Sequence, residues 1–98
     1  MYSQTYYLLR SKQDGRHLSA RDTTETSDKL FLLVFIADYE ALVYLSTHAP
    51  DMRDRFTVES ISVHQLKMLL TRWGFTGIGI VRDPTASVVE FLKGDGQP

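Results

Sequence analysis

Apolar residues recur at helical spacing in two short segments of the chain. In Ser62–Gly74, one face carries the apolar residues Val63, Leu66, Leu70 and Trp73, with Leu69 at its edge. Ser62 can cap the first turn, and Gln65 can reach back to the Ser62 backbone N–H. Gly74 stands where a left-handed residue ends many helices. The pattern predicts a complete short helix with both ends marked.

A second helix is predicted from Tyr39 to His48. Its apolar positions at helical spacing are Ala41, Leu42 and Leu45. Asp38 precedes the segment and is a favourable N-cap residue. Pro50 follows it closely and stops the helix. The next residues, Asp51–Arg55, are charged and predict a solvated turn.

Strand patterns flank and separate the two helices. We predict strands at Thr5–Leu9, Leu30–Ile36, Phe56–Ser62, Gly77–Arg82 and Val88–Leu92. Leu30–Ile36 is apolar throughout, which is typical of a central strand covered on both faces. Ser11–Lys29 is polar and has no sustained apolar period, so we predict a long polar loop over residues 11–29. Asp83 and Pro84 predict the turn between the last two strands.

The predicted order along the chain is β-β-α-β-α-β-β. A strand, a helix and a strand in succession favour a β-α-β crossover, while the short link before the last strand favours an antiparallel pair. We therefore predict an α+β fold of α/β-like character, a single layer mixed sheet of four or five strands with two helices packed on it. Residues 1–98 form one domain, with a frayed tail at 93–98.

Composition narrows the class of protein without identifying its activity. The 98 residues are 43% hydrophobic and 23% charged, which is ordinary for a globular domain. The net charge of −1 lacks the basic balance of a general nucleic-acid binder. The chain has no cysteine, which excludes disulfides, thiol catalysis and Cys-ligated zinc.

No segment of the sequence predicts export or membrane insertion. The N-terminus lacks a basic stretch followed by a long apolar run, so we expect no signal peptide. The longest apolar run, Leu30–Ala37, is far shorter than the roughly 20 residues that a transmembrane helix needs. We therefore expect a cytoplasmic protein with no membrane partner.

Three glycines resemble a nucleotide-binding loop only superficially. Gly74, Gly77 and Gly79 have the reverse spacing of the dinucleotide fingerprint, and they enter a strand rather than open a helix. We interpret Gly77 and Gly79 as positions on one side of a strand where a helix approaches closely. On this interpretation Gly79→Val clashes with the packed helix.

Other candidate chemistry is sparse. His48, Asp51 and Asp54 have a spacing that could hold a divalent metal, but Pro50 breaks the helix that would align them and no fourth ligand matches. The sequence has no nucleophile elbow and no evident triad. We predict no catalytic residue, no metal site and no cofactor, which favours a non-enzymatic protein and leaves the enzyme question open.

Protein interaction is the leading hypothesis. Tyr2, Tyr6 and Tyr7 make the first strand aromatic, and a first or last strand at a sheet edge could pair with another chain. The partner would be another protein or a second copy, with Arg10 and Arg16 as a polar rim. Alternatively, Tyr6 or Tyr7 fills the core and its neighbour is half exposed.

Two further hypotheses remain open. A small ligand, or a weak enzymatic activity, could use the C-terminal strand ends, where the polar residues are Asp38, Ser62, His64 and Arg82. Single-stranded nucleic acid could bind a basic and aromatic surface formed by Arg10, Lys12, Arg16 and Arg21 with Tyr6 and Tyr7. Neighbouring acidic residues and the near-neutral net charge count against the nucleic-acid hypothesis.

From Leu30 to Phe91 (residues 30–91) the pattern resembles the SseB-like domain, a small α/β module of bacterial proteins. The matching positions are the strand ending at Phe35, Leu42, Leu45, Ile61, Ser62, Leu66, Leu69, Leu70, Gly77, Ile80, Asp83 and Pro84. The chain departs from that pattern at Ile36 and Ala37, where the family often has a threonine. The resemblance implies a fold and a protein-interaction role, and no site residue.

Overall fold

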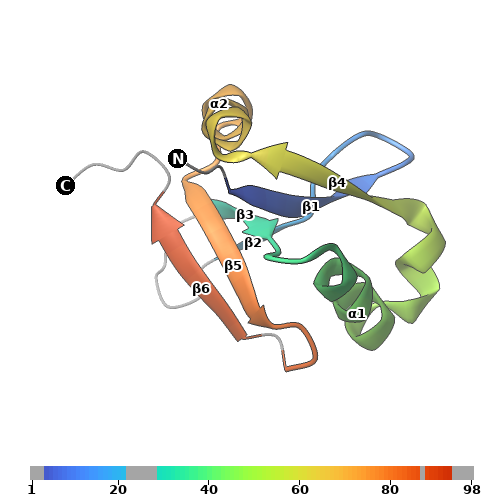
Figure 1. The fold of residues 1–98 in the computed structure, drawn as a ribbon. Coiled ribbons are helices and arrows are strands. Elements are labelled where there is room, and N and C mark those ends of the chain that lie inside the picture. Colours follow the sequence, from blue (N-terminus) through green and yellow to red (C-terminus); the bar gives the residue numbers. More distant parts are fainter. Residues whose placement is uncertain (1–3, 22–28, 87, 94–98) are drawn as a thin grey trace.

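The computed structural model describes residues 4–21, 29–86 and 88–93 (Figure 1). In chain order these ranges contain β1 (Thr5–Ser11), β2 (Ser19–Arg21), β3 (Leu30–Val34), helix α1 (Asp38–His48), 3₁₀ helix η1 (Pro50–Arg55), β4 (Phe56–Ser62), helix α2 (Val63–Trp73), β5 (Gly77–Asp83) and β6 (Val88–Lys93). The predicted α+β class is confirmed. The solvated turn predicted at Asp51–Arg55 is instead part of the 3₁₀ helix.

The described strands form two sheets, so the predicted single layer of four or five strands is wrong. One sheet has the order β2-β3-β5-β6, and the other pairs β1 with β4. In the larger sheet β3 and β5 are parallel, whereas β2 and β6 run antiparallel to their neighbours. The antiparallel pairing expected of the last two strands is confirmed.

Strand β1 joins the two sheets and is enclosed on both sides. It pairs with β4 over its full length, from Thr5 opposite Ser62 to Ser11 opposite Phe56. On its other side, the Tyr7 N–H donates to the Phe35 carbonyl at 2.9 Å and the Phe35 N–H donates back at 2.8 Å. From Tyr7 to Ser11, the first strand is therefore not the open sheet edge that was considered for it.

The segment predicted as one loop, residues 11–29, contains a tight turn and strand β2. The Ser11 N–H donates to the Arg16 carbonyl at 2.7 Å, and Gly15 has the positive φ of 72° that this turn requires. β2 then pairs with β3. Three mixed residues carry no strand periodicity of their own, so only the pairing reveals β2. Residues 22–28 of the predicted loop lie outside the described residues, as do 94–98 of the predicted tail, and Lys93 ends β6.

Helix α2 has the predicted ends, but helix α1 is capped differently. The Ser62 hydroxyl accepts from the Gln65 N–H at 3.2 Å, and Gly74 is left-handed with φ 74°. In α1 the N-cap is Ala37, and Asp38 is the first helical residue, so the predicted Asp38 cap is wrong. The Glu40 carboxylate accepts from the Ala37 N–H at 3.4 Å, a bond that the sequence reading missed.

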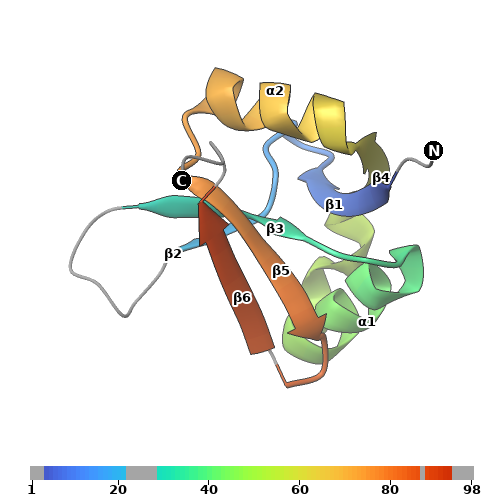
Figure 2. The ribbon, with the colours of Figure 1, turned by 60° about the vertical axis from the view of Figure 1, so that its left-hand side comes forward.

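The two helices cover opposite sides of the strands, as two views show (Figures 1 and 2). Alternate residues of β1 and β3 supply the two cores. One core comprises Leu9, Leu33, Phe35, Val81 and the α1 residues Ala41 and Leu45. The other comprises Leu8, Leu32, Val34 and the α2 residues Leu66 and Leu70. The continuous apolar run of β3 follows from this double coverage.

The crossover through α2 connects one sheet to the other. β4 pairs with β1 and β5 pairs with β3, so β4 and β5 are not neighbours. At Gly79, a Cβ atom would meet Val89 Cγ1 at 2.9 Å and Leu33 Cδ2 at 3.3 Å. Neighbouring strands, not a helix, make the close approach there. No helix in the described ranges is long and apolar enough to cross a membrane.

Candidate functional site: an open sheet edge beside an apolar groove

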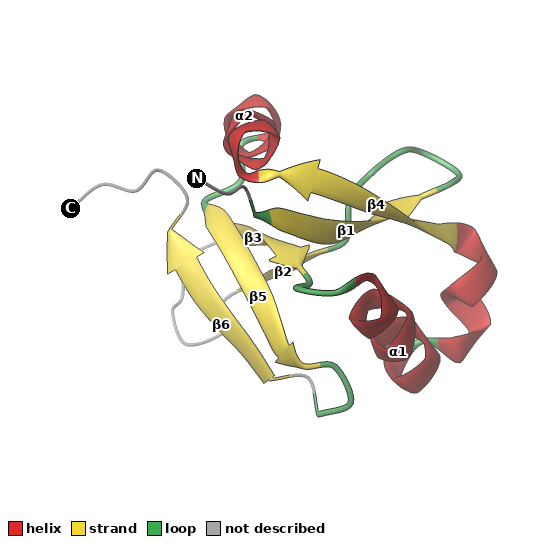
Figure 3. Cartoon of the chain, viewed as in Figure 1, coloured by secondary structure: helices red, strands yellow, loops and turns green. Residues whose placement is uncertain are grey.

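Strand β6 forms one outer edge of the larger sheet (Figure 3). Within the described part of the chain it pairs with β5 alone. In an antiparallel ladder, alternate residues direct their backbone groups toward opposite neighbours. About half of the β6 backbone donors and acceptors therefore face away from β5, where another strand could pair with them.

Side chains of β6 alternate between the two faces of the sheet. Val89 packs against the core beneath α1, and Phe91 makes an edge contact with Phe31 at a ring-centroid distance of 4.9 Å. Val88 and Leu92 lie on the opposite face and are 52% and 41% exposed. The edge therefore presents apolar side chains that helix α2 does not cover.

An apolar groove separates α2 from β6 on that face. Its volume is about 170 Å³, and it is lined by Tyr6, Val63, Leu66, Lys67, Leu70, Ile78, Leu92 and Lys93. We call it the α2–β6 groove. A closed cavity of about 150 Å³ with apolar walls holds benzene, so this volume suits one large apolar side chain. The groove brings together residues of four elements that no local sequence pattern connects.

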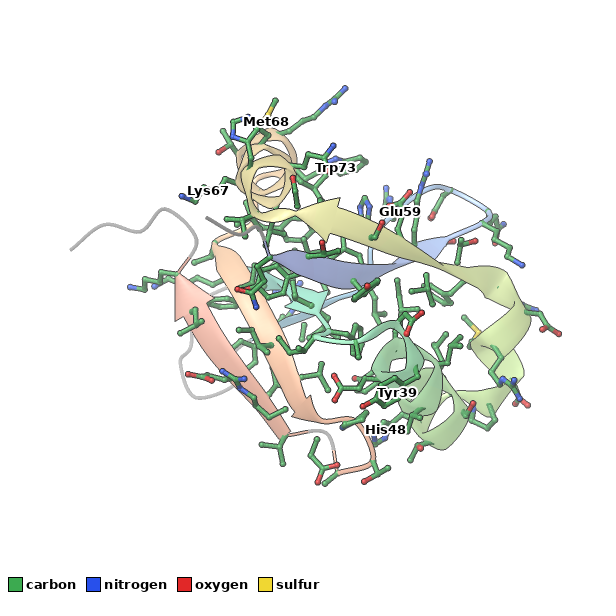
Figure 4. All side chains as sticks on the ribbon, viewed as in Figure 1. Tyr39, His48, Glu59, Lys67, Met68 and Trp73 are labelled. Atoms are coloured by element: carbon green, nitrogen blue, oxygen red, sulfur yellow. The ribbon has the colours of Figure 1, made fainter. Side chains whose placement is uncertain are left out.

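The charged residues of the α2–β6 groove are both lysines. Neither Lys67 nor Lys93 forms an ion pair with another described residue. In Figure 4, Lys67 and Met68 leave α2 in different directions, and Met68 points away from the sheets. Nearby on the sheet, Arg82 and Glu90 neutralise one another at 2.7 Å. The groove is thus lined by apolar residues, one tyrosine and two positively charged residues.

The residues predicted for an N-terminal interaction surface are dispersed. Tyr6 is half-buried and lines the α2–β6 groove, whereas Tyr7 is half-buried against the other core. Arg10 is paired with Glu59 at 2.9 Å, and the Arg16 guanidinium lies 3.9 Å from Asp14. Tyr2 lies outside the described residues. Of this set, only Tyr6 belongs to the site at β6.

Ion pairs and burial also make the basic and aromatic surface considered for nucleic acid less suited to binding it. Glu59 and Asp14 accompany two of its arginines, and both tyrosines contribute to the cores. The aromatic faces that would stack on bases are therefore half-buried.

A polar cluster that sequence reasoning missed connects the segment between β1 and β2 to α2. His17 Nε2 lies 3.5 Å from a Glu59 carboxylate oxygen, and the His17 ring meets Trp73 edge-on at 6.1 Å. The His17 side chain is only 8% exposed, and its Nδ1 has no hydrogen-bond partner. Such a ring cannot reach a substrate in solution, so we assign the cluster a structural role. Its members are far apart in sequence, and only strand register brings them together.

The four residues considered for a ligand crevice do not share a described cavity. Ser62 caps α2 and Arg82 pairs with Glu90, so both polar groups are used within the fold. Asp38 and His64 are exposed at the starts of different helices. Because β4 ends in a different sheet from β3 and β5, the strand ends do not converge.

The fold also does not bring together His48, Asp51 and Asp54, the three residues considered for a metal ion. His48 Nε2 lies 2.8 Å from the Pro84 carbonyl oxygen, so the tautomer with hydrogen on Nε2 donates there. Asp54 lines a separate cavity of about 330 Å³ between the first turn and η1, which includes neither His48 nor Asp51. Among the described residues, no three His, Asp or Glu side chains are grouped for a metal ion.

The turn that leads into β6 is held by Asp83. Its carboxylate accepts from the Thr85 hydroxyl at 2.8 Å, the Thr85 N–H at 3.1 Å and the Ala86 N–H at 3.3 Å. These bonds, chiefly that from the Thr85 hydroxyl, hold the pKa of Asp83 below its ordinary value. The turn thus fixes the end of β6 that begins the open edge.

Comparisons with known proteins add nothing to the functional assignment, which therefore rests on the geometry described above. No protein-family model, no curated protein and no solved structure matches the chain.

Proposed function

We propose that the protein is a non-enzymatic interaction module that binds an extended segment of another protein along β6. The observation that carries the proposal is the coincidence of an open strand edge with the α2–β6 groove on the same side of the sheet. An incoming strand would satisfy the outward backbone groups of β6, and its alternate side chains would face the groove.

This mode of binding separates affinity from selectivity. Backbone hydrogen bonds along β6 accept almost any extended sequence, because every non-proline residue offers the same groups. The groove then selects a side chain by shape and polarity. Tyr6, predicted as an interaction residue, contributes through this groove rather than through a strand edge of its own.

The edge at β4, in the smaller sheet, supports the proposal less well. A larger hollow of about 480 Å³ lies between β4 and α2. Its lining is more polar, because Glu59 and Arg72 carry opposite charges and Ser60 and Gln65 are neutral polar residues. Met68 lines it and is 60% exposed. This hollow therefore provides a control surface for experiments on β6.

The resemblance to the SseB-like domain agrees with an interaction role and adds no site residue. We extend the proposal to a module that acts in the cytoplasm as a protein-binding unit without a cofactor.

The proposal is tested by selecting peptides of about eight residues, enough to span the six residues of β6, from a random displayed library. Leu92→Lys places a charge in the groove at a half-exposed site and should lower the affinity of selected peptides about tenfold or more. Met68→Lys makes the same kind of change on the control surface and should leave affinity unchanged. Equal losses in both variants, or no selected peptide at all, would contradict the proposal.

A further inference from the structure

We propose that the segment bound at β6 is acidic as well as apolar: one large apolar side chain enters the α2–β6 groove, and neighbouring Asp or Glu residues meet Lys67 and Lys93. This inference rests on the proposed function and specifies its partner. The occupant is a segment of a different protein.

Charge complementarity is the first argument. Two lysines and no acidic residue line the groove. Neither lysine has an ion-pair partner among the described residues, so both charges are available to a ligand. A basic segment would be repelled there, whereas an acidic one gains steering and selectivity.

The second argument is the size and position of the groove. Its volume of about 170 Å³ admits one side chain of roughly the size of a phenylalanine or leucine. Leu92 on the edge strand and Ile78 on its neighbour are register partners, and both line the groove. A strand added beside β6 would therefore bring every second side chain to the groove side, and one of these can enter.

The charge pattern of the edge argues against a second copy. In a symmetric antiparallel pair of β6 strands centred on Glu90, the two copies of Glu90 would be directly opposed. The register centred on Phe91 would place Lys93 opposite the half-buried Val89. A foreign acidic segment faces neither conflict.

The test is the composition of the selected peptides together with a charge reversal. Wild-type protein should enrich peptides with one large apolar residue and Asp or Glu within about two positions of it, since alternate residues share a face. Lys67→Glu with Lys93→Glu should lower the affinity for these acidic peptides about tenfold and shift selection toward Lys and Arg.

Lys12→Glu with Arg53→Glu is the matched control, because it changes the net charge equally at two exposed positions outside the groove. It should leave affinity and selection as in the wild type. An equal loss in both double variants would show a general charge effect and overturn the inference.

Failure of the inference is distinguishable from failure of the proposed function. Peptides that bind, lose affinity with Leu92→Lys and show no acidic preference would overturn the inference and leave β6 binding intact. Peptides insensitive to Leu92→Lys would overturn both. Dimerisation through β6 in light scattering, competing with peptide, would replace the foreign segment with a second copy and also overturn the inference.

Discussion

At the scale of single residues, the stability of the fold depends on a few positions where a single side-chain group is either excluded or required. Gly79 is one, because any side chain there enters space held by Val89 and Leu33 from the two adjacent strands. Asp83 is another, because three donors converge on its carboxylate. Both residues lie in the β5–β6 hairpin, which carries the proposed binding edge.

Gly79→Ala should destabilise the protein by about 1–3 kcal/mol, since the new Cβ lies 2.9 Å from Val89 Cγ1 in a packed region. Val89→Ala added to it should recover part of the loss, because it removes the clashing methyl group. Urea unfolding of the single and double variants measures both effects. A Gly79→Ala protein as stable as the wild type would contradict this packing.

Asp83 predicts a specific dependence of stability on pH. Its pKa is lowered in the folded state, so its contribution is present above the ordinary Asp pKa of 3.8 and is lost as the pH falls through the lower folded value. Asp83→Asn should therefore lower the Tm near neutral pH and reduce the drop in Tm on acidification. Identical pH profiles for the two proteins would show that the turn does not depend on this carboxylate.

At the scale of elements, a helix or strand could be predicted when its own residues carry both its end signals and its apolar pattern. Helix α2 carries its cap, its apolar face and its terminal glycine within one short segment, and it forms as predicted. Trp73, expected on the buried face, is instead half exposed and contacts His17. Strand β2 and the pairing of β1 were missed, because both depend on hydrogen bonds between distant segments rather than on local periodicity.

Ser62→Ala should cost about 1 kcal/mol, because the hydroxyl that accepts from the Gln65 N–H is lost. Ser62→Asp, which can cap the same N–H, should retain most of the stability. Thermal unfolding monitored by circular dichroism compares the two variants. If alanine and aspartate were equally tolerated, the cap would contribute nothing measurable.

The contact between His17 and Trp73 predicts that position 17 tolerates substitution by phenylalanine. Because the buried Nδ1 has no partner, His17→Phe removes a desolvated polar atom while keeping a ring against Trp73. Stability should therefore change by less than about 1 kcal/mol in either direction. A loss of several kcal/mol in chemical denaturation would show that the contact with Glu59 outweighs the unpaired nitrogen.

At the scale of the whole molecule, the two sheets decide where a partner can bind. The first strand pairs with β4 on one side and with Phe35, just after β3, on the other. The outer strands that remain are β2 and β6 in the larger sheet and β4 in the smaller one. The sequence supported a mixed α+β fold and named the last strand as a possible edge. It could not locate the groove, since the groove combines β1, α2, β5 and β6.

Amide hydrogen exchange by NMR, with and without a selected peptide, tests the central claim most directly. Strand addition at β6 predicts slower exchange at alternate amides of Val88–Lys93, because only those that face outward gain partners. Amides of β1 and β4 should exchange as before. Protection that appears along β4 while β6 stays unchanged would contradict the proposed binding edge.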